Sequence, residues 1–259
     1  MLHARPLAPP ALVAAAVAAL RARCGAPLRA FATYSDDVYE RARRRLVGEA
    51  SASGEFDVVL ELTPGDLDDA FRAANAATLA IERGGGLWLW KPWVASRALA
   101  LLADGDFLVY FDAGCKLKHS LEPWFALAAA NDPGWVVFEF GEGIPTWTKG
   151  DTYAALGLTT DAFVDKQQVL GGIWVMRKTP TTARLAAEWL RVSQLPGVIT
   201  DDPSVTPNPG GFVEHRHDQS VFSLLVRMFD VKTVVKDESY PEDHAERLMW
   251  PVIAARSRD

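Results

Sequence analysis

The chain has 259 residues, a net charge of −6 from 27 basic and 33 acidic side chains, and 49% apolar residues. A chain of this length and composition buries one sizeable hydrophobic core, so we expect a single folded domain rather than disorder. The acidic balance lacks the excess of Lys and Arg that binding to a phosphate backbone requires, which argues against nucleic acid as a partner. The two cysteines, Cys24 and Cys115, cannot build a disulfide framework and suit a reducing compartment, so a cytoplasmic location is expected.

The first 27 residues are rich in alanine. Their longest apolar run, from Ala11 to Leu20, is about half of the roughly 20 residues that a membrane span needs. Arg21 and Arg23 follow where a signal peptide would carry small residues for cleavage. We therefore expect a helical segment over residues 1–27 with no transmembrane span, followed by the main domain over residues 28–259.

Segments with strand and helix patterns alternate from residue 28 onward. The run Phe107–Phe111 is wholly apolar and bounded by Gly105 and Asp112, which is typical of a strand buried on both faces. The alternation predicts an α/β fold with a mostly parallel sheet between helices. In chain order we expect a strand at 28–34, a helix at 35–47, a strand at 56–62, helices at 66–83 and 92–103, strands at 107–111, 135–140 and 172–177, and helices at 181–192 and 218–229.

Two carboxylate motifs compete for a functional role. In open α/β sheets, ligands bind beyond the carboxyl ends of the strands. Asp104-Gly105-Asp106 is a literal D-x-D, but it precedes the strand at 107–111 and so lies about 17 Å from that edge. We interpret it as a turn. Asp112 directly follows the strand, in Asp112-Ala113-Gly114-Cys115, where small neighbours let a phosphate or metal ion approach; the alternative is that Asp112 caps the next turn.

Two further clusters combine chemically useful side chains. His215 and His217 alternate with charged residues before a predicted helix, a pattern that can ligate Mn²⁺ or Mg²⁺; alternatively, Asp218 only caps that helix. Lys91 opens another helix among Trp88, Trp90 and Trp93, a location suited to anions, although the tryptophans can equally be core residues and Lys91 can reach outward to solvent. We expect five of the nine tryptophans to lie next to the pocket: Trp88, Trp90, Trp93, Trp147 and Trp174.

Three runs in order resemble bacterial and viral glycosyltransferase-like proteins of the GT-A type. They begin at Arg83-Gly84-Gly85-Gly86-Leu87-Trp88-Leu89-Trp90-Lys91-Pro92, continue with Gly105–Cys115, and end with His215-Arg216-His217-Asp218-Gln219-Ser220. The resemblance spans residues 28–240. It implies a GT-A, Rossmann-like mixed sheet, and a transferase that uses a UDP- or GDP-linked sugar as donor.

The resemblance also implies roles for individual residues. Asp112 takes the place of the first carboxylate of the metal-binding D-x-D, whereas Gly114 stands where the last carboxylate is expected. Either Asp112 therefore shares a Mn²⁺ or Mg²⁺ ion with His215 or His217, or catalysis uses no metal. The remaining donor-binding positions implied are Thr33, Tyr34, Gly171, Gly172 and Gln219, with Gly171 and Gly172 read as a turn preceding a strand.

A reaction follows as a hypothesis. Lys91, with or without a metal at Asp112, would stabilise the departing diphosphate, and Asp218 would deprotonate an acceptor hydroxyl in an inverting transfer or orient the donor in a retaining one. The loop containing Trp147, Lys149 and Asp151 is assigned to sugar contact. The alternatives are a metal-dependent phosphoesterase or nucleotidyl-type enzyme, and a nucleotide-sugar-binding protein without catalysis.

Overall fold

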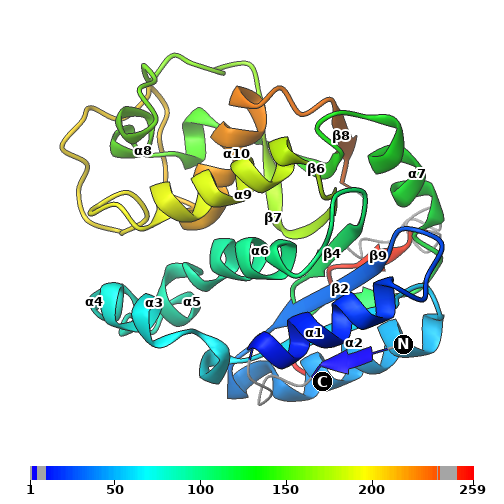
Figure 1. The fold of residues 1–259 in the computed structure, drawn as a ribbon. Helices are drawn as coiled ribbons and strands as arrows, with labels where there is room; N and C mark the ends of the chain where they lie inside the picture. Colours follow the sequence, from blue (N-terminus) through cyan, green and yellow to red (C-terminus); the bar gives the residue numbers. More distant parts are fainter. Residues whose placement is uncertain (1, 5–9, 238, 240–249) are drawn as a thin grey trace.

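The computed structural model describes residues 2–4, 10–237, 239 and 250–259. Within these residues, the central sheet has seven strands in the order β1-β3-β2-β4-β7-β6-β8 (Figure 1). Strand β7 runs antiparallel to both of its neighbours, while all other neighbouring strands pair in parallel. The bounds are β1 Leu2–Ala4, β2 Arg29–Tyr34, β3 Val58–Leu62, β4 Phe107–Phe111, β6 Trp135–Gly143, β7 Gln167–Arg177 and β8 Thr233–Lys236. The predicted α/β class with a mixed, mostly parallel sheet flanked by helices is confirmed.

Helices cover both faces of the sheet. All five residues of β4 are buried. Leu108 and Tyr110 face one hydrophobic cluster, and Phe107, Val109 and Phe111 face the other, because successive side chains of a strand point to opposite faces. The first cluster packs under α1 (Pro10–Arg21), α6 (Trp90–Ala100), α9 (Pro180–Ser193) and α10 (His217–Met228), and the second under α2 (Glu40–Ser53) and α7 (Glu122–Ala130).

The predicted helix over residues 66–83 is wrong. The segment breaks into a 3₁₀ turn at Pro64–Asp66 and two short helices, α3 (Asp69–Ala74) and α4 (Ala76–Leu79). The break falls at Asn75, whose backbone leaves the helical region at φ −119° and ψ 18°. Its side-chain amide donates to the carbonyl oxygen of Phe71 and to the side chain of Gln194, at 2.8 and 3.1 Å. The residue at which the helix ends thus contacts a side chain over a hundred positions away.

A left-handed turn follows at α5 (Gly84–Leu87). Five consecutive residues have positive φ, namely Gly84, Gly85, Gly86, Leu87 and Trp88. A Cβ atom at Gly84 would lie 2.5 Å from the Trp88 ring, and one at Gly86 would lie 2.8 Å from the Cα of Leu79. Glycine therefore supplies both the conformation and the space. The turn reverses the chain and starts α6 with Lys91 in its first turn.

The remaining described elements lie at the borders of the sheet. Strand β1 pairs with β3, so residues ahead of position 28 contribute an edge strand. A separate two-stranded sheet joins β5 (Lys116–Leu117) to β9 (Val252–Ile253), and α8 (Gly150–Ala155) lies over one end of the molecule (Figure 1). No helix in the part of the chain that the structure describes is long and apolar enough to cross a membrane.

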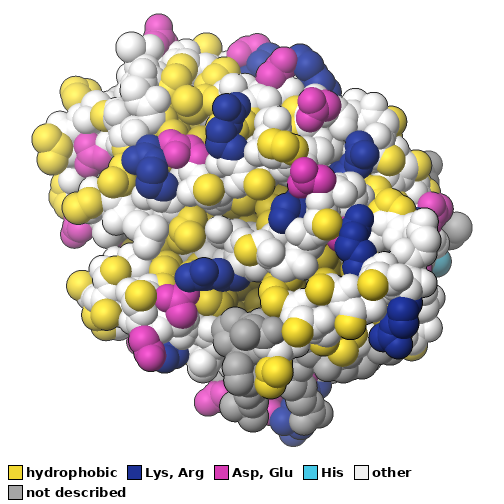
Figure 2. Space-filling model, viewed as in Figure 1, with side chains coloured by type: hydrophobic (Ala, Val, Ile, Leu, Met, Phe, Trp, Pro, Cys, Tyr) yellow, Lys and Arg dark blue, Asp and Glu magenta, His cyan; other side chains and the backbone are white. Residues whose placement is uncertain are grey.

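The surface carries charges of both signs. On the face viewed in Figure 2, acidic and basic side chains are interspersed with hydrophobic ones, and Lys and Arg form no continuous patch there. This distribution agrees with the net charge of −6.

Asp106 of the literal D-x-D is a structural residue. Its carboxylate is fully buried and accepts hydrogen bonds from the backbone N–H groups of Leu28 and Ala103, at 2.8 and 2.9 Å. It also pairs with the guanidinium of Arg21 on α1. The motif therefore ties the N-terminal helix and the start of β2 to the turn before β4, and its interpretation as a turn is confirmed.

We predict that Asp106→Ala lowers the free energy of unfolding by about 3 kcal/mol, because it leaves two buried N–H groups without their charged acceptor. Asp104 is exposed, so Asp104→Ala in the same motif is the matched control and should leave stability unchanged. Urea denaturation of both variants makes the comparison. Equal stability of the two would contradict the structural role of Asp106.

Candidate functional site

A cavity of about 900 Å³ opens at the carboxyl edge of the sheet. The end of β2, the residues after β4, the middle of β7 and the start of α10 all meet there. Ligands of open α/β sheets bind beyond the carboxyl ends of the strands, so a ligand site is expected at this place. Of the predicted site residues, the cavity is lined by Tyr34, Lys91, Asp112, Trp147, Gly172, His217, Asp218 and Gln219.

An ion pair between a buried lysine, Lys91, and a half-exposed carboxylate, Asp112, lines this cavity. The Lys91 ammonium lies 3.0 Å from Oδ1 and 3.3 Å from Oδ2 of Asp112. The Lys91 side chain is only 5% exposed, whereas Asp112 is 42% exposed. Burial alone would lower the pKa of Lys91, but the carboxylates of Asp112 and Asp218 outweigh it and raise that pKa. Lys91 is therefore a permanent cation.

Two neighbours hold the Asp112 carboxylate in place. The hydroxyl of Tyr110 donates to Oδ1 of Asp112 at 2.7 Å, and the Asp112 backbone N–H donates to the Gly172 carbonyl oxygen at 2.8 Å. A Cβ atom at Gly172 would lie 2.2 Å from Oδ2 of Asp112. Only glycine fits at this point. The structure also corrects one prediction, because Gly171 and Gly172 lie inside β7 rather than in a turn before it.

Asp218 is the second carboxylate of the cavity. It is 3% exposed, and its Oδ2 accepts no hydrogen bond from the residues that the structure describes. Burial raises the pKa of Asp218 to about 7, with Lys91 lowering it and Asp112 raising it. The side chain of Gln219 accepts from the Gly171 backbone N–H at 3.1 Å and so fixes the start of α10 against β7. A carboxylate with a free oxygen and a pKa near neutrality can exchange a proton with a bound hydroxyl.

Tyr34 and Thr33, at the end of β2, differ in exposure to the cavity. Tyr34 lines the cavity and stacks on Trp90 with ring centroids 4.0 Å apart and planes 14° from parallel. The Trp90 indole N–H in turn donates to the Gly84 carbonyl oxygen at 3.0 Å. Thr33 is fully buried and is not among the residues that line the cavity. Of the two, only Tyr34 is placed to touch a ligand.

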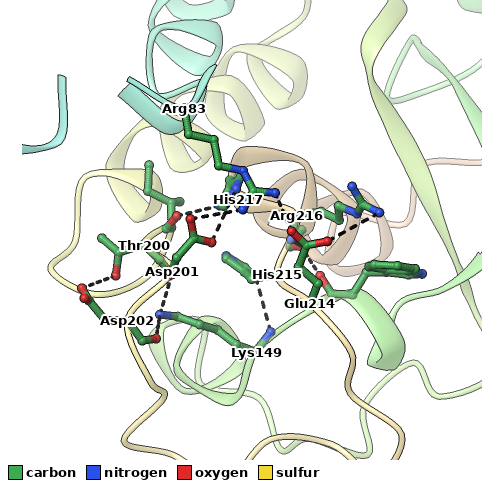
Figure 3. A network of polar contacts seen from close by, with 12 residues as sticks. Arg83, Lys149, Thr200, Asp201, Asp202, Glu214, His215, Arg216 and His217 are labelled. Atoms are coloured by element: carbon green, nitrogen blue, oxygen red, sulfur yellow. Dashed lines mark hydrogen bonds and ion pairs between the residues drawn. The ribbon is translucent and has the colours of Figure 1, made fainter. Parts of the chain in front are cut away.

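The two histidines belong to a network beside the cavity (Figure 3). His217 contacts the Ile199 carbonyl oxygen through Nδ1 at 3.0 Å, and its Nε2 lies 3.7 Å from a carboxylate oxygen of Asp201. His215 accepts a hydrogen bond from the Lys149 backbone N–H at 3.4 Å. Burial lowers the pKa of both imidazoles, so both rings are neutral at pH 7.

Arg83 joins this network to the left-handed turn. It reaches across to Asp201, at 3.3 Å, and to Glu214 (Figure 3). Trp88, from the same turn, stacks on His217 with centroids 5.3 Å apart. The turn that positions Lys91 is thus connected to the loop that precedes α10.

The three proposed metal ligands do not form one site: the His215 and His217 ring centroids lie 5.6 Å apart, but Asp112 is paired with Lys91. Both oxygens of Asp112 contact the Lys91 ammonium, Gly114 brings no ligand, and His215 and His217 bond to the neighbouring loops. Among the residues described, no three His, Cys, Asp or Glu side chains gather closely enough to hold a metal ion. This set of donors does not fit a divalent cation, and we derive no step through one.

The three residues predicted to contact a sugar have different environments. Trp147 lines the cavity, with its indole N–H donating to Glu142 at 2.6 Å and the Arg216 guanidinium 4.1 Å from its ring centroid. Lys149 is buried and donates through its ammonium to carbonyl oxygens of the loop after α9. Asp151 accepts from the backbone N–H groups of residues 205 and 206 in the same loop. Only Trp147 faces the cavity.

Sequence reasoning missed several residues at this site. Tyr110 stands two positions before Asp112, the spacing that places both side chains on one face of a strand, so the pattern contained that signal. Arg256 and Arg258 also line the cavity, and no local pattern indicates this. Two expected tryptophans are absent from the lining: Trp174 is a core residue stacked on Tyr110, and Trp93 packs against Phe71.

No protein-family model matches the sequence, and no curated protein matches it either. Among solved structures, the apo crystal structure of mouse xyloside xylosyltransferase 1 is similar with a TM-score of 0.43 and 10% sequence identity. The match covers 82% of this chain and 86% of that chain. We therefore argue the function of this chain from its own site.

We predict that Gly172→Ala disrupts the ion pair, because its methyl group would overlap the Asp112 carboxylate. It should lower the melting temperature by several degrees. Gly171→Ala is the control, since its methyl group would make an ordinary 3.4 Å contact with Asp218. Thermal unfolding of both variants tests the claim, and equal losses would contradict the close approach at Gly172.

We predict that Asp218→Asn stabilises the protein above pH 7. The folded-state pKa of about 7 lies above the ordinary value of 3.8. Between these values the native state binds more protons than the unfolded state, so wild-type stability falls as pH rises. The variant should gain relative to wild type over this window, reaching at most about 4 kcal/mol, and the gain should level off above pH 7. Chemical denaturation at pH 4 to 8 measures it, with Asp104→Asn as control. A pH-independent difference would contradict the assignment.

Proposed function

We propose that this protein is a glycosyltransferase that moves a sugar from a nucleoside-diphosphate sugar to an acceptor hydroxyl. The observation that carries the proposal is the cavity itself: it is lined both by a cation, Lys91, which pairs with Asp112, and by a buried carboxylate, Asp218, whose Oδ2 accepts no hydrogen bond from the described residues. Transfer of a sugar needs both groups, because negative charge builds up on the departing diphosphate while the acceptor loses a proton.

The donor would lie with its diphosphate toward Lys91. The Lys91 ammonium is held by Asp112, and the partial exposure of Asp112 leaves the pair open to the cavity. A phosphate that approaches the Lys91–Asp112 pair meets one cation and one anion. As negative charge grows on the leaving diphosphate, the Lys91 ammonium would turn from Asp112 toward it. Tyr34 and Trp90 form an aromatic wall on which a nucleobase would stack.

Asp218 would act as the base in an inverting transfer. The acceptor proton moves to the Asp218 carboxylate, the acceptor oxygen forms a bond to the anomeric carbon, and the bond from that carbon to the diphosphate breaks. Trp147, on the loop after β6, would provide an apolar face for a sugar ring. These roles would place a glycan or another hydroxyl compound as the acceptor.

A panel of UDP- and GDP-linked sugars, each with Mn²⁺ and with EDTA, tests the proposal by release of nucleoside diphosphate. We expect turnover to rise as pH increases from 6 to 8, because Asp218 is an active base only when deprotonated and its pKa is about 7. Asp218→Asn should lower kcat by about 10² to 10⁴-fold and leave donor binding within a few fold. Asp104→Asn should behave as wild type.

The same panel separates the alternatives. Donor binding without release of nucleoside diphosphate, even by slow hydrolysis, would favour a binding protein over an enzyme. Hydrolysis of phosphate esters in the absence of any sugar transfer would favour a phosphoesterase. If no nucleotide sugar binds under either condition, the proposal is wrong.

A further inference from the structure

The turn after β4 is covered by a segment from far along the chain. A Cβ atom at Gly114 would lie 3.0 Å from the Cα of Arg256 and 3.3 Å from its carbonyl carbon. The backbone at Arg256 would therefore have to shift to make room for any side chain at position 114. This is the position that the GT-A resemblance assigns to the last carboxylate of the D-x-D. In this protein the backbone of Arg256 packs against it.

The covering segment, residues 250–259, has a fixed course. Strand β9 pairs with β5, with Ile253 opposite Lys116. The Ala254 backbone N–H donates to the carbonyl oxygen of Ser239 at 2.7 Å. Beyond the arginines, the carbonyl oxygen of Asp259 accepts from Arg45 on α2, at 2.7 Å. Hydrogen bonds on both sides of Arg256 and Arg258 thus set the path of the segment past the cavity.

This course brings two arginines to the cavity of the Lys91–Asp112 pair. Arg256 and Arg258 both line it, and the Arg258 guanidinium lies 5.5 Å from the centroid of the Tyr39 ring, which also lines it. Guanidinium groups bind phosphate oxygens in pairs of hydrogen bonds, which makes arginine well suited to a diphosphate.

We propose that Lys91, Arg256 and Arg258 form a diphosphate-binding site that works without a divalent cation. Lys91 supplies the fixed charge in the cavity, and the 250–259 segment adds two charges from above the Asp112-Ala113-Gly114 turn. The inference rests on the proposed function in naming the ligand as the diphosphate of a sugar nucleotide. The anion site itself can be measured without any transfer reaction.

Isothermal titration with inorganic pyrophosphate and with UDP, in EDTA and then in Mn²⁺, tests the site on the full chain. We expect both probes to bind in EDTA, and Mn²⁺ to tighten binding by no more than about threefold. The double variant Arg256→Gln/Arg258→Gln should weaken binding by at least about tenfold, as expected for loss of charge-assisted hydrogen bonds. The matched control is Arg184→Gln on α9, an exposed arginine outside the cavity lining, which should bind as wild type.

A second variant keeps both arginines but shifts the backbone that carries them. Gly114→Ala should displace the backbone of Arg256 and weaken pyrophosphate binding in EDTA by several fold, with the melting temperature as a check on folding. Binding that appears only with Mn²⁺, or an arginine double variant that binds as wild type, would overturn the site. Sugar transfer that depends strictly on Mn²⁺ would leave the proposed function standing while this inference fails. Pyrophosphate binding that the arginine variant loses, in a protein that transfers no sugar, would leave the inference standing instead.

Discussion

The ammonium of Lys91, which is only 5% exposed, would be costly to bury at the end of the central strand without the carboxylate of Asp112 beside it. Isolated charges lose several kcal/mol on leaving water, and a partner at hydrogen-bond distance returns much of that cost. The pair at 3.0 Å, in which the Asp112 carboxylate also accepts from the Tyr110 hydroxyl, lets Lys91 be buried there. The surrounding architecture follows from this requirement. Gly172 clears space for the carboxylate, and the left-handed turn starts α6 so that Lys91 points at it.

The same pair keeps charge within the site balanced. Asp218 lies in a region that already contains Asp112, and two carboxylates without a cation would both resist ionisation. With Lys91 present, Asp218 gains or loses its proton near neutral pH. The two carboxylates therefore have different roles: Asp112 contacts the Lys91 ammonium, while Asp218 can change its protonation state near neutral pH.

Much of the fold and part of the site could be predicted from sequence, where the signal is local. The apolar run of β4 predicted a buried strand, and ligands of open α/β sheets bind beyond the carboxyl ends of strands. Together these two points placed Asp112 at the cavity and Asp106 in a structural turn. Predictions failed where a distant contact decides the outcome. Asn75 ends a helix because it reaches Gln194, and Arg256 reaches the cavity because β9 pairs with β5. Neither pairing leaves a periodic trace in the sequence.

The histidines illustrate the same limit in another way. Two imidazoles among carboxylates form a plausible ligand pattern in sequence, yet their ring nitrogens are directed by backbone groups of two other loops. The spacing of two residues in a loop does not determine the direction in which their side chains point, because a loop has no regular repeat. His217 itself has positive φ, at 50°, and its ring stacks on Trp88 while the His215 ring meets it edge-on, with centroids 5.6 Å apart.

The left-handed turn also has a consequence for how this protein can change through evolution. Leu87 and Trp88 occupy a backbone region that costs non-glycine residues about 1–3 kcal/mol each, and two of the glycines before them, Gly84 and Gly86, leave almost no volume for a side chain. Most single substitutions across these positions would therefore be selected against on folding grounds, even though they need never touch a ligand. Divergent relatives of this chain should keep this short stretch long after the surrounding helices have changed, which makes it a more durable marker of common ancestry than the carboxylates of the site.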